Sequence, residues 1–170
     1  STQGVTLFPY TTLFRSQGAC DMGALPNVFP GYQRVNDKAA KEKFEKAWGV
    51  ANLSDKPGIM IPAMLEALPE KKIRALYIFG ENLANSEPDI AHVEHCLGSA
   101  EFLVCNDIFP TETTRFAHVV FPAAAWSEDD GTFTSSERRV SRVRKAGPPP
   151  GEAKPNWWIF KEIARRMGST

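Results

Sequence analysis

The stretch that most constrains the fold is a short apolar run, Ala75–Phe79, that ends at Gly80 and continues into polar Glu81 and Asn82. Charged residues precede this run and none falls inside it, which is typical of a strand buried on both faces of a parallel sheet. In open α/β sheets, ligands bind just beyond the carboxyl ends of such strands. The sequence therefore predicts a ligand-binding turn directly after this strand.

Two further apolar runs repeat the pattern. Phe102–Cys105 is followed by Asn106 and Asp107, and His118–Phe121 is followed by Pro122. Strand–helix–strand–helix–strand order predicts an α/β fold, a Rossmann-like, doubly wound and mostly parallel sheet. Four helices are expected around it: 37–48, capped by Asn36 and ended by Gly49; 63–68; 88–97, with Pro88 in its first turn; and 157–167, which is amphipathic.

Composition narrows the class of protein. The chain has 170 residues, 42% of them hydrophobic, with 20 Lys and Arg against 20 Asp and Glu. Zero net charge gives no reason to expect nucleic acid as a partner. No apolar stretch approaches the roughly 20 residues that span a bilayer, so membrane insertion is not expected. The basic run 138–145 contains interleaved valines and is more typical of an edge strand than of a nucleic-acid patch.

Cysteine and histidine spacing gives no metal site. Cys20, Cys96 and Cys105 show no CxxC pattern, and we interpret them as reduced thiols of a cytoplasmic-type protein. His92 and His95 lie three residues apart on a predicted helix without a third ligand nearby, so we expect surface histidines.

The first sixteen residues differ from the rest. Thr6–Ser16 has neither a helical period nor sustained alternation, and it resembles a translated reading frame of a widely used sequencing-library adapter. We expect residues 1–16 to be a non-native segment and assign them no role. Residues 17–168 then form one partial α/β domain.

The segment 17–33 is rich in glycine and proline and predicts a compact, irregular structure. Its glycines admit close approach of a bulky ligand, with Gln17 and Asp21 available for hydrogen bonds. On the pattern alone, the favoured interpretation is an ordered loop that ties two elements together.

Residue types at the strand ends point to a nucleotide. A phosphate can approach the backbone after Gly80, and Asp107 lies where nucleotide-binding folds place an acid on ribose hydroxyls. A carboxylate there can also take two donors from a guanine edge. No GxGxxG run, GxxxxGK[ST] loop, nucleophile elbow or metal quartet is present. The residues alone predict a nucleotide-binding α/β unit without chemistry of its own.

Several motifs together resemble the molybdopterin-dependent oxidoreductases, and most of all the alpha subunit of formate dehydrogenase. They are QGACDMGALPNVFPGYQ from Gln17, YIFGEN from Tyr77, NDIFPTETTRFAHVVFPAAAW from Asn106 and the final NWWIFKEIARRMG. The resemblance implies a large enzyme with molybdenum or tungsten bis(molybdopterin guanine dinucleotide) and at least one [4Fe-4S] cluster. Formate is the implied substrate, and NAD-linked, ferredoxin-linked or membrane electron-transfer subunits are implied partners.

The resemblance also implies which residues bind the cofactor. Those expected on the strand-end turns that hold one guanine dinucleotide are Gly80, Glu81, Asn82, Ser86, Asn106, Asp107 and Thr111. Gly131 and Thr132 are expected on the loop after the third strand, and Asn156 just before the last helix. Gln17, Gly18 and Asp21 are expected near the pterin end.

The resemblance assigns no catalytic residue and no metal or cluster ligand to this chain, because the family's ligands lie upstream of these motifs. It therefore implies a fragment that has no turnover alone. Three alternatives stay open: a fragment of a nitrate reductase-like enzyme, a fragment of the large iron–sulfur subunit of complex I, or a stand-alone nucleotide-binding domain without catalysis.

Overall fold

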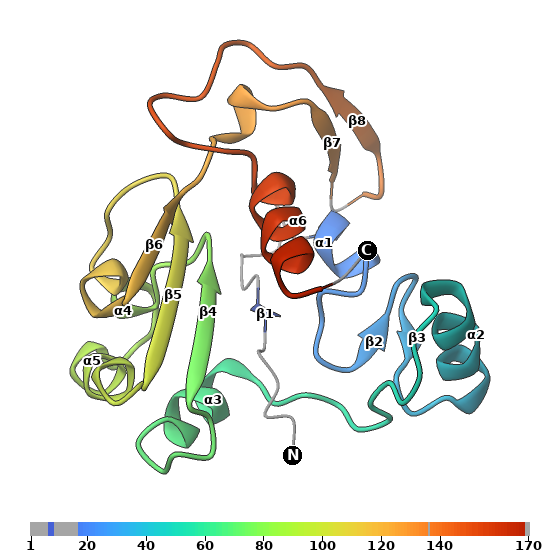
Figure 1. The fold of residues 1–170 in the computed structure, drawn as a ribbon, viewed down its shortest axis with the longest axis horizontal. Helices are drawn as coiled ribbons and strands as arrows, with labels where there is room; N and C mark the ends of the chain where they lie inside the picture. The colour runs from blue at the N-terminus through green and yellow to red at the C-terminus, as the bar shows by residue number, and fades with distance from the viewer. Residues whose placement is uncertain (1–6, 9–16, 136, 169–170) are drawn as a thin grey trace.

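The computed structural model describes residues 7–8, 17–135 and 137–168 (Figure 1). Within these ranges, eight strands lie in three sheets: β1 (Leu7–Phe8), β2 (Val28–Phe29), β3 (Gln33–Arg34), β4 (Ala75–Phe79), β5 (Phe102–Asp107), β6 (Val119–Pro122), β7 (Gly131–Thr134) and β8 (Val140–Val143). The helices are α1 (Gln17–Asp21), α2 (Lys38–Trp48), α3 (Ile61–Ala67), α4 (Leu83–Ser86), α5 (Ile90–Gly98) and α6 (Asn156–Arg166), with short 3-10 turns η1 (Thr113–Phe116) and η2 (Trp126–Glu128).

A parallel sheet in the order β1-β4-β5-β6 organises the chain. Ile78 pairs with Cys105, and Cys105 with Val120, so the three predicted strands are confirmed as neighbours in one sheet. Their carboxyl ends lie along one edge and point upward in Figure 1. Leu7–Phe8 pairs in parallel with β4. The remainder of the segment expected to be non-native lies outside the described residues.

One face of the sheet packs against α3 and α5. Alternate side chains of β4 and β5 point to this face, as the pleat of a strand requires. Leu76 and Ile78 meet Leu103 and Cys105 there, together with apolar side chains from both helices. This cluster is the main hydrophobic core.

The opposite face packs against α6. Phe160 lies 5.4 Å from the ring of Tyr77 and 5.3 Å from that of Phe79, measured between centroids. Helices on both faces confirm the predicted doubly wound arrangement. Beside α6, an apolar hollow of about 570 Å³ lies over β5 and β6 and is lined in part by Val104 and Phe121.

The segment 17–33 is more regular than the sequence predicts. It contains α1 and, with Arg34 just beyond it, the antiparallel pair β2–β3. The sequence did not predict these elements because two-residue strands and a five-residue helix carry too little periodicity to be detected. Phe29 of this hairpin packs on Phe44 of α2, with ring centroids 4.9 Å apart. The helix α2 is confirmed, but its N-cap is Asp37 rather than Asn36, since the Asp37 carboxylate accepts from the N–H of Ala39.

The helix expected at 88–97 begins later. Asp89 is the N-cap of α5 and accepts from the N–H of His92, which leaves Pro88 in the turn before the helix. The separate turn of helix α4 precedes it. The helix expected at 63–68 begins at Ile61 and ends at Ala67.

A two-stranded antiparallel ribbon, β7–β8, follows η2 and extends beyond the carboxyl edge of the sheet (Figure 1). Gly131 pairs with Val143 and Thr132 with Arg142. These two predicted site residues therefore lie in a strand and not in a loop. The sequence does not predict this strand, because the acids at 128–130 followed by Gly131 are typical of a turn. The basic run forms the second strand of the ribbon, as expected for an edge strand.

No helix in the described ranges is long and apolar enough to cross a membrane. Those same ranges contain no cluster of three metal-ligating side chains.

Candidate nucleotide-binding site

Gly80 forms the turn at the carboxyl end of β4. Its φ of +60° lies in the left-handed region that favours glycine. Its N–H donates to the backbone oxygen of Asn106 at 2.8 Å, which ties the ends of β4 and β5 together. A Cβ at this position would meet nothing within 4 Å. The turn is therefore exposed and open to a ligand.

Asn82 is held by the loop that follows β5. Its Oδ1 accepts from Thr113 Oγ1 at 2.8 Å and from the Thr113 N–H at 3.2 Å, and its Nδ2 donates to Glu112 at 2.7 Å. This bond to Asn82 lowers the pKa of Glu112. Thr113 is fully buried and also accepts from the N–H of Ala84. The structure shows Asn82 as a bridge that fixes the turn after β4.

Two carboxylates share this edge. Burial raises the pKa of Glu81, a bond from Ser86 opposes the shift, and the nearby charges of Glu87 and Asp107 add to it. The Ser86 hydroxyl donates to Glu81 Oε1 at 2.8 Å. Asp107 Oδ1 accepts from the N–H of Ile108 at 2.7 Å. Repulsion between these carboxylates favours a ligand that brings hydrogen-bond donors.

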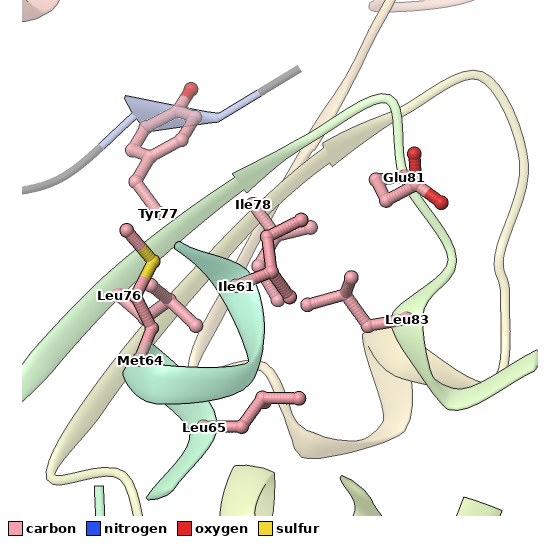
Figure 2. Close-up of a pocket in the computed structure, with 8 residues that line it drawn as sticks. All are labelled: Ile61, Met64, Leu65, Leu76, Tyr77, Ile78, Glu81 and Leu83. Atoms are coloured by element: carbon pink, nitrogen blue, oxygen red, sulfur yellow. The ribbon is translucent and has the colours of Figure 1, made fainter. Parts of the chain in front are cut away.

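Figure 2 shows a small pocket beneath Glu81, between α3 and β4. Apart from Glu81, the labelled side chains around it are apolar except for the hydroxyl of Tyr77. Its volume of about 20 Å³ is close to that of a single water-sized probe, so it is a packing gap in the core. The gap is too small for a nucleotide, so a nucleotide site at this end of the sheet would lie outside it, along the exposed edge.

Asn106 lies on the other face of the sheet and is 1% exposed. Its Nδ2 donates to Oδ1 of Asn156, the first residue of α6, at 2.8 Å. Its own Oδ1 has no hydrogen-bond partner among the described residues. A buried carbonyl oxygen without a donor is costly, which indicates that a ligand or water supplies one.

The next residue of α6 bonds to the segment that leads into the ribbon. Trp157 Nε1 donates to Asp129 Oδ2 at 3.0 Å, and Asp130 accepts from the N–H of Lys145 at 3.2 Å. A hollow of about 160 Å³ between the acids and the ribbon is lined in part by Gly131 and Thr132. The first turn of α6 thus connects the end of β5 to the segment that precedes β7.

Gln17, Gly18 and Asp21 form a separate group on α1. Gln17 donates to Asp21 at 2.9 Å and to the hydroxyl of Tyr32 at 3.0 Å, and Asp21 lies 3.3 Å from the guanidinium of Arg138. A Cβ on Gly18 would lie 3.3 Å from the hydroxyl of Thr134 on β7. This group therefore contacts the ribbon and not the strand-end turns.

The structure brings some of the predicted site residues together and leaves others apart. Gly80, Glu81, Asn82, Ser86, Asn106 and Asp107 lie at the carboxyl ends of β4 and β5, and Asn156 joins them through its bond to Asn106. Thr111, in the loop before η1, bonds to Thr114 and to no other residue that the structure describes. Three contributors were missed by sequence reasoning: Thr113, Asp129 and Trp157.

The two helix histidines differ in their surroundings. His95 is exposed, as expected. His92 Nε2 lies 3.0 Å from Glu66 of α3 and 3.5 Å from the thiol of Cys96. This contact links α3 to α5 and has no connection with the strand-end edge.

Comparisons with known proteins place the chain in a family. The molybdopterin oxidoreductase family model matches residues 2–166. The chain is 54% identical over 152 residues to the F420-dependent formate dehydrogenase subunit alpha of Methanocaldococcus jannaschii, covering 89% of this chain and 22% of that protein. It is 45% identical over 166 residues to the putative formate dehydrogenase YrhE of Bacillus subtilis, covering 98% of this chain and 17% of that protein. Formate dehydrogenase H of Escherichia coli is 41% identical over 152 residues, with coverage of 89% and 21%.

A solved structure shares the fold. Acetylene hydratase from Pelobacter acetylenicus superposes with a TM-score of 0.57 at 24% identity, over 75% of this chain and 18% of that one. The chain thus spans about a fifth of the length of the curated relatives that it matches. It belongs to the molybdopterin oxidoreductase family, whose cofactor is a molybdenum or tungsten pterin.

Proposed function

We propose that this chain is the part of a formate dehydrogenase alpha subunit that binds a guanine dinucleotide of a molybdenum or tungsten bis(molybdopterin guanine dinucleotide). The parent enzyme would oxidise formate to carbon dioxide and pass electrons through iron–sulfur clusters to a partner subunit. The names of the relatives support the activity, and the exposed edge at the ends of β4 and β5 supports the binding role.

The observation that carries the proposal is the carbonyl oxygen of Asn106, which is buried and has no partner among the described residues. Guanine carries N–H donors on its ring and exocyclic amino group, so it can supply the missing bond. Gly80 leaves the neighbouring turn free of side-chain atoms. The residues present therefore fit a guanine nucleotide lying across this edge.

Each residue of the edge would have a distinct part. Asp107 keeps Oδ2 free of bonds to the described residues while Oδ1 holds the N–H of Ile108, so it can accept from a ribose hydroxyl or a guanine N–H. Asn82 would hold the turn in place rather than touch the ligand, because its carbonyl oxygen already accepts two bonds. The roles of Gln17, Gly18 and Asp21 toward the pterin, and of Gly131 and Thr132, stay predictions.

When bound, the metal pterin supplies the redox centre at which formate loses two electrons. This chain's own residues bind and orient that group, and we assign no catalytic residue or cluster ligand to the described ranges. Their contribution to turnover is therefore indirect. A substitution among them should lower the amount of bound cofactor, and the rate of formate oxidation should fall as a consequence.

The test uses a polypeptide that carries this chain in its genomic context, with Asp107→Ala compared against Asp55→Ala. Asp55 is an exposed loop acid whose carboxylate accepts no hydrogen bond from any described residue. We expect Asp107→Ala to lower the guanine nucleotide released per polypeptide about tenfold, as loss of a hydrogen bond to a charged group does, and formate oxidation to fall in proportion. Unchanged nucleotide content would remove Asp107 from the site, and no formate oxidation in the unaltered protein would refute the activity.

A further inference from the structure

His118 lies directly before β6, at the end of the sheet opposite the candidate site, and it bonds to β5 twice. Its backbone N–H donates to the oxygen of Leu103 at 2.8 Å, and its ring nitrogen Nδ1 accepts from the N–H of Leu103 at 3.1 Å. Regular pairing of the two strands begins one residue later, where Val119 pairs with Val104. The imidazole therefore holds the amino ends of β5 and β6 together, as a backbone acceptor would.

The bond from Leu103 fixes where the neutral imidazole carries its proton. Nδ1 accepts a hydrogen bond only while it has no hydrogen of its own, so the proton must lie on Nε2. A half-turn of the ring would put Cδ2 in the same place, and a carbon offers no acceptor. Leu103 is 0% exposed, so water does not readily replace Nδ1 as the partner of its N–H.

We propose that His118 is a pH-sensitive switch that releases the amino end of β6 from β5 in acid. A second proton on the imidazole occupies Nδ1, and two N–H groups then face each other in place of one hydrogen bond. The side chain of His118 is exposed, so this proton reaches it from solvent. Because β6 is the outermost strand in the order β1-β4-β5-β6, its amino end can separate while β4 and β5 stay paired.

The charged and titratable groups near this end of the sheet do not offset the second proton. Arg74 Nε donates to Glu101 at 2.7 Å, so that carboxylate already has a cationic partner. Asp107 lies at the other end of β5, about 13 Å along the strand from Leu103. The remaining groups on the elements that adjoin His118 are Arg115 of η1, which is a cation, and Cys105 of β5, whose pKa burial raises to about 12.

The direction of the pH dependence follows from the loss of an acceptor. An ordinary imidazole gains its second proton near pH 6.5. The bond from Leu103 is therefore present above that pH and is lost as the pH falls through it. The carboxyl ends of the same two strands are joined by other groups, since the N–H of Ala123 donates to the backbone oxygen of Asp107 at 2.9 Å. Acid should open one end of this strand pair and leave the other closed.

Amide hydrogen exchange of the full chain, followed by NMR at pH 7.5 and pH 5.5, tests the switch. The measured quantity is the protection factor, the intrinsic exchange rate divided by the observed one, which removes the ordinary pH dependence of exchange. An ordinary imidazole is about 10% protonated at pH 7.5 and about 90% at pH 5.5, so we expect the protection factor of the Leu103 amide to fall about tenfold. That of the Ala123 amide should change far less.

Three variants separate the switch from a merely structural role. His118→Asn and His118→Asp each keep an acceptor oxygen near the place of Nδ1, and neither side chain gains a proton between these two pH values. In both variants the Leu103 protection factor should be the same at pH 5.5 as at pH 7.5. His95→Asn is the matched control, because His95 is exposed and its ring bonds to no residue that the structure describes. This control should keep the tenfold fall.

The ¹⁵N chemical shifts of the His118 ring give a second readout, which needs no variant to fold. At pH 7.5 they should show a hydrogen on Nε2 and none on Nδ1. A hydrogen on Nδ1 at that pH would overturn the inference, as would an unchanged Leu103 protection factor in the unaltered chain or an equal fall in His118→Asn. An equal fall at Ala123 would mean general acid unfolding and would also overturn it. Nucleotide binding enters none of these measurements, so their outcome is separate from that of the proposed function.

Discussion

Thr113 Oγ1 donates to Asn82 Oδ1 across 2.8 Å, and this bond joins the loop after β5 to the turn after β4. The same oxygen of Thr113 accepts from the N–H of Ala84 at 3.0 Å. One buried hydroxyl therefore holds both a side chain and a backbone group of the candidate site.

The first prediction concerns this hydroxyl. Thr113→Val keeps the shape of the side chain but leaves the Ala84 N–H buried without its acceptor, so we expect a loss of about 1–3 kcal/mol in the free energy of unfolding. Urea denaturation measures it. Thr132→Val, on exposed β7, is the control and should change stability by less than about 0.5 kcal/mol. Equal effects from the two substitutions would show that the network contributes no stability.

A second prediction concerns the repulsion at the edge. Burial and the neighbouring charges of Glu87 and Asp107 raise the pKa of Glu81, so its charged form destabilises the ligand-free chain at neutral pH. We expect Glu81→Gln to raise stability at pH 7 by about 0.5 kcal/mol while weakening nucleotide binding. The gain should vanish below pH 4.5, the ordinary value for a glutamate, where Glu81 is already protonated. If Glu81→Gln still raised stability below pH 4.5, the charge of Glu81 would not be the cause of the gain.

Thiol reactivity gives a third prediction. Burial raises the pKa of Cys105 to about 12 and also raises that of Cys96, so both thiols are neutral and enclosed at pH 8. Cys20 is only half-buried. A thiol reagent should therefore label Cys20 in the native chain and all three cysteines after denaturation. Rapid native labelling of Cys105 would contradict the packing of β5.

Alkaline pH should weaken the fold, which is a fourth prediction. Burial raises the pKa of Tyr77 from 10.0 and of Cys105 from 9.0, both to about 12. The unfolded chain loses these protons first, so the stabilisation is complete below pH 9 and is lost as the pH rises toward 12. Urea midpoints at pH 8 and pH 11 should show this decline, and it should be smaller in Tyr77→Phe. An equal decline in that variant would exclude Tyr77 as a contributor.

The long, strongly patterned elements could be read from the sequence. The strands β4, β5 and β6 are continuous apolar runs, and the stripe of Ile159, Phe160 and Ile163 predicts α6. The apolar runs also located the strand-end turns, because each run stops at a turn-forming or polar residue: Gly80, Asn106 or Pro122. These features depend on local patterns alone.

The features that were missed depend on contacts between distant residues. Thr113 resembles any loop threonine until the fold brings it to Asn82, and Trp157 resembles a packing residue until it meets Asp129. The strand β7 forms only because β8 pairs with it, although Gly131 and the acids before it resemble a turn. Short elements such as β2 and β3 have no detectable period.

The central claim is that the carboxyl ends of β4 and β5 bind a guanine nucleotide. The most direct measurement is the change in ¹⁵N–¹H chemical shifts of the chain on titration with guanosine diphosphate. The predicted result is that the largest shifts fall on the backbone amides of Gly80 and Asp107 and on the side-chain amide of Asn106, with none on α2. Shifts confined to α2 or to the β2–β3 hairpin, with the strand ends unchanged, would contradict the account.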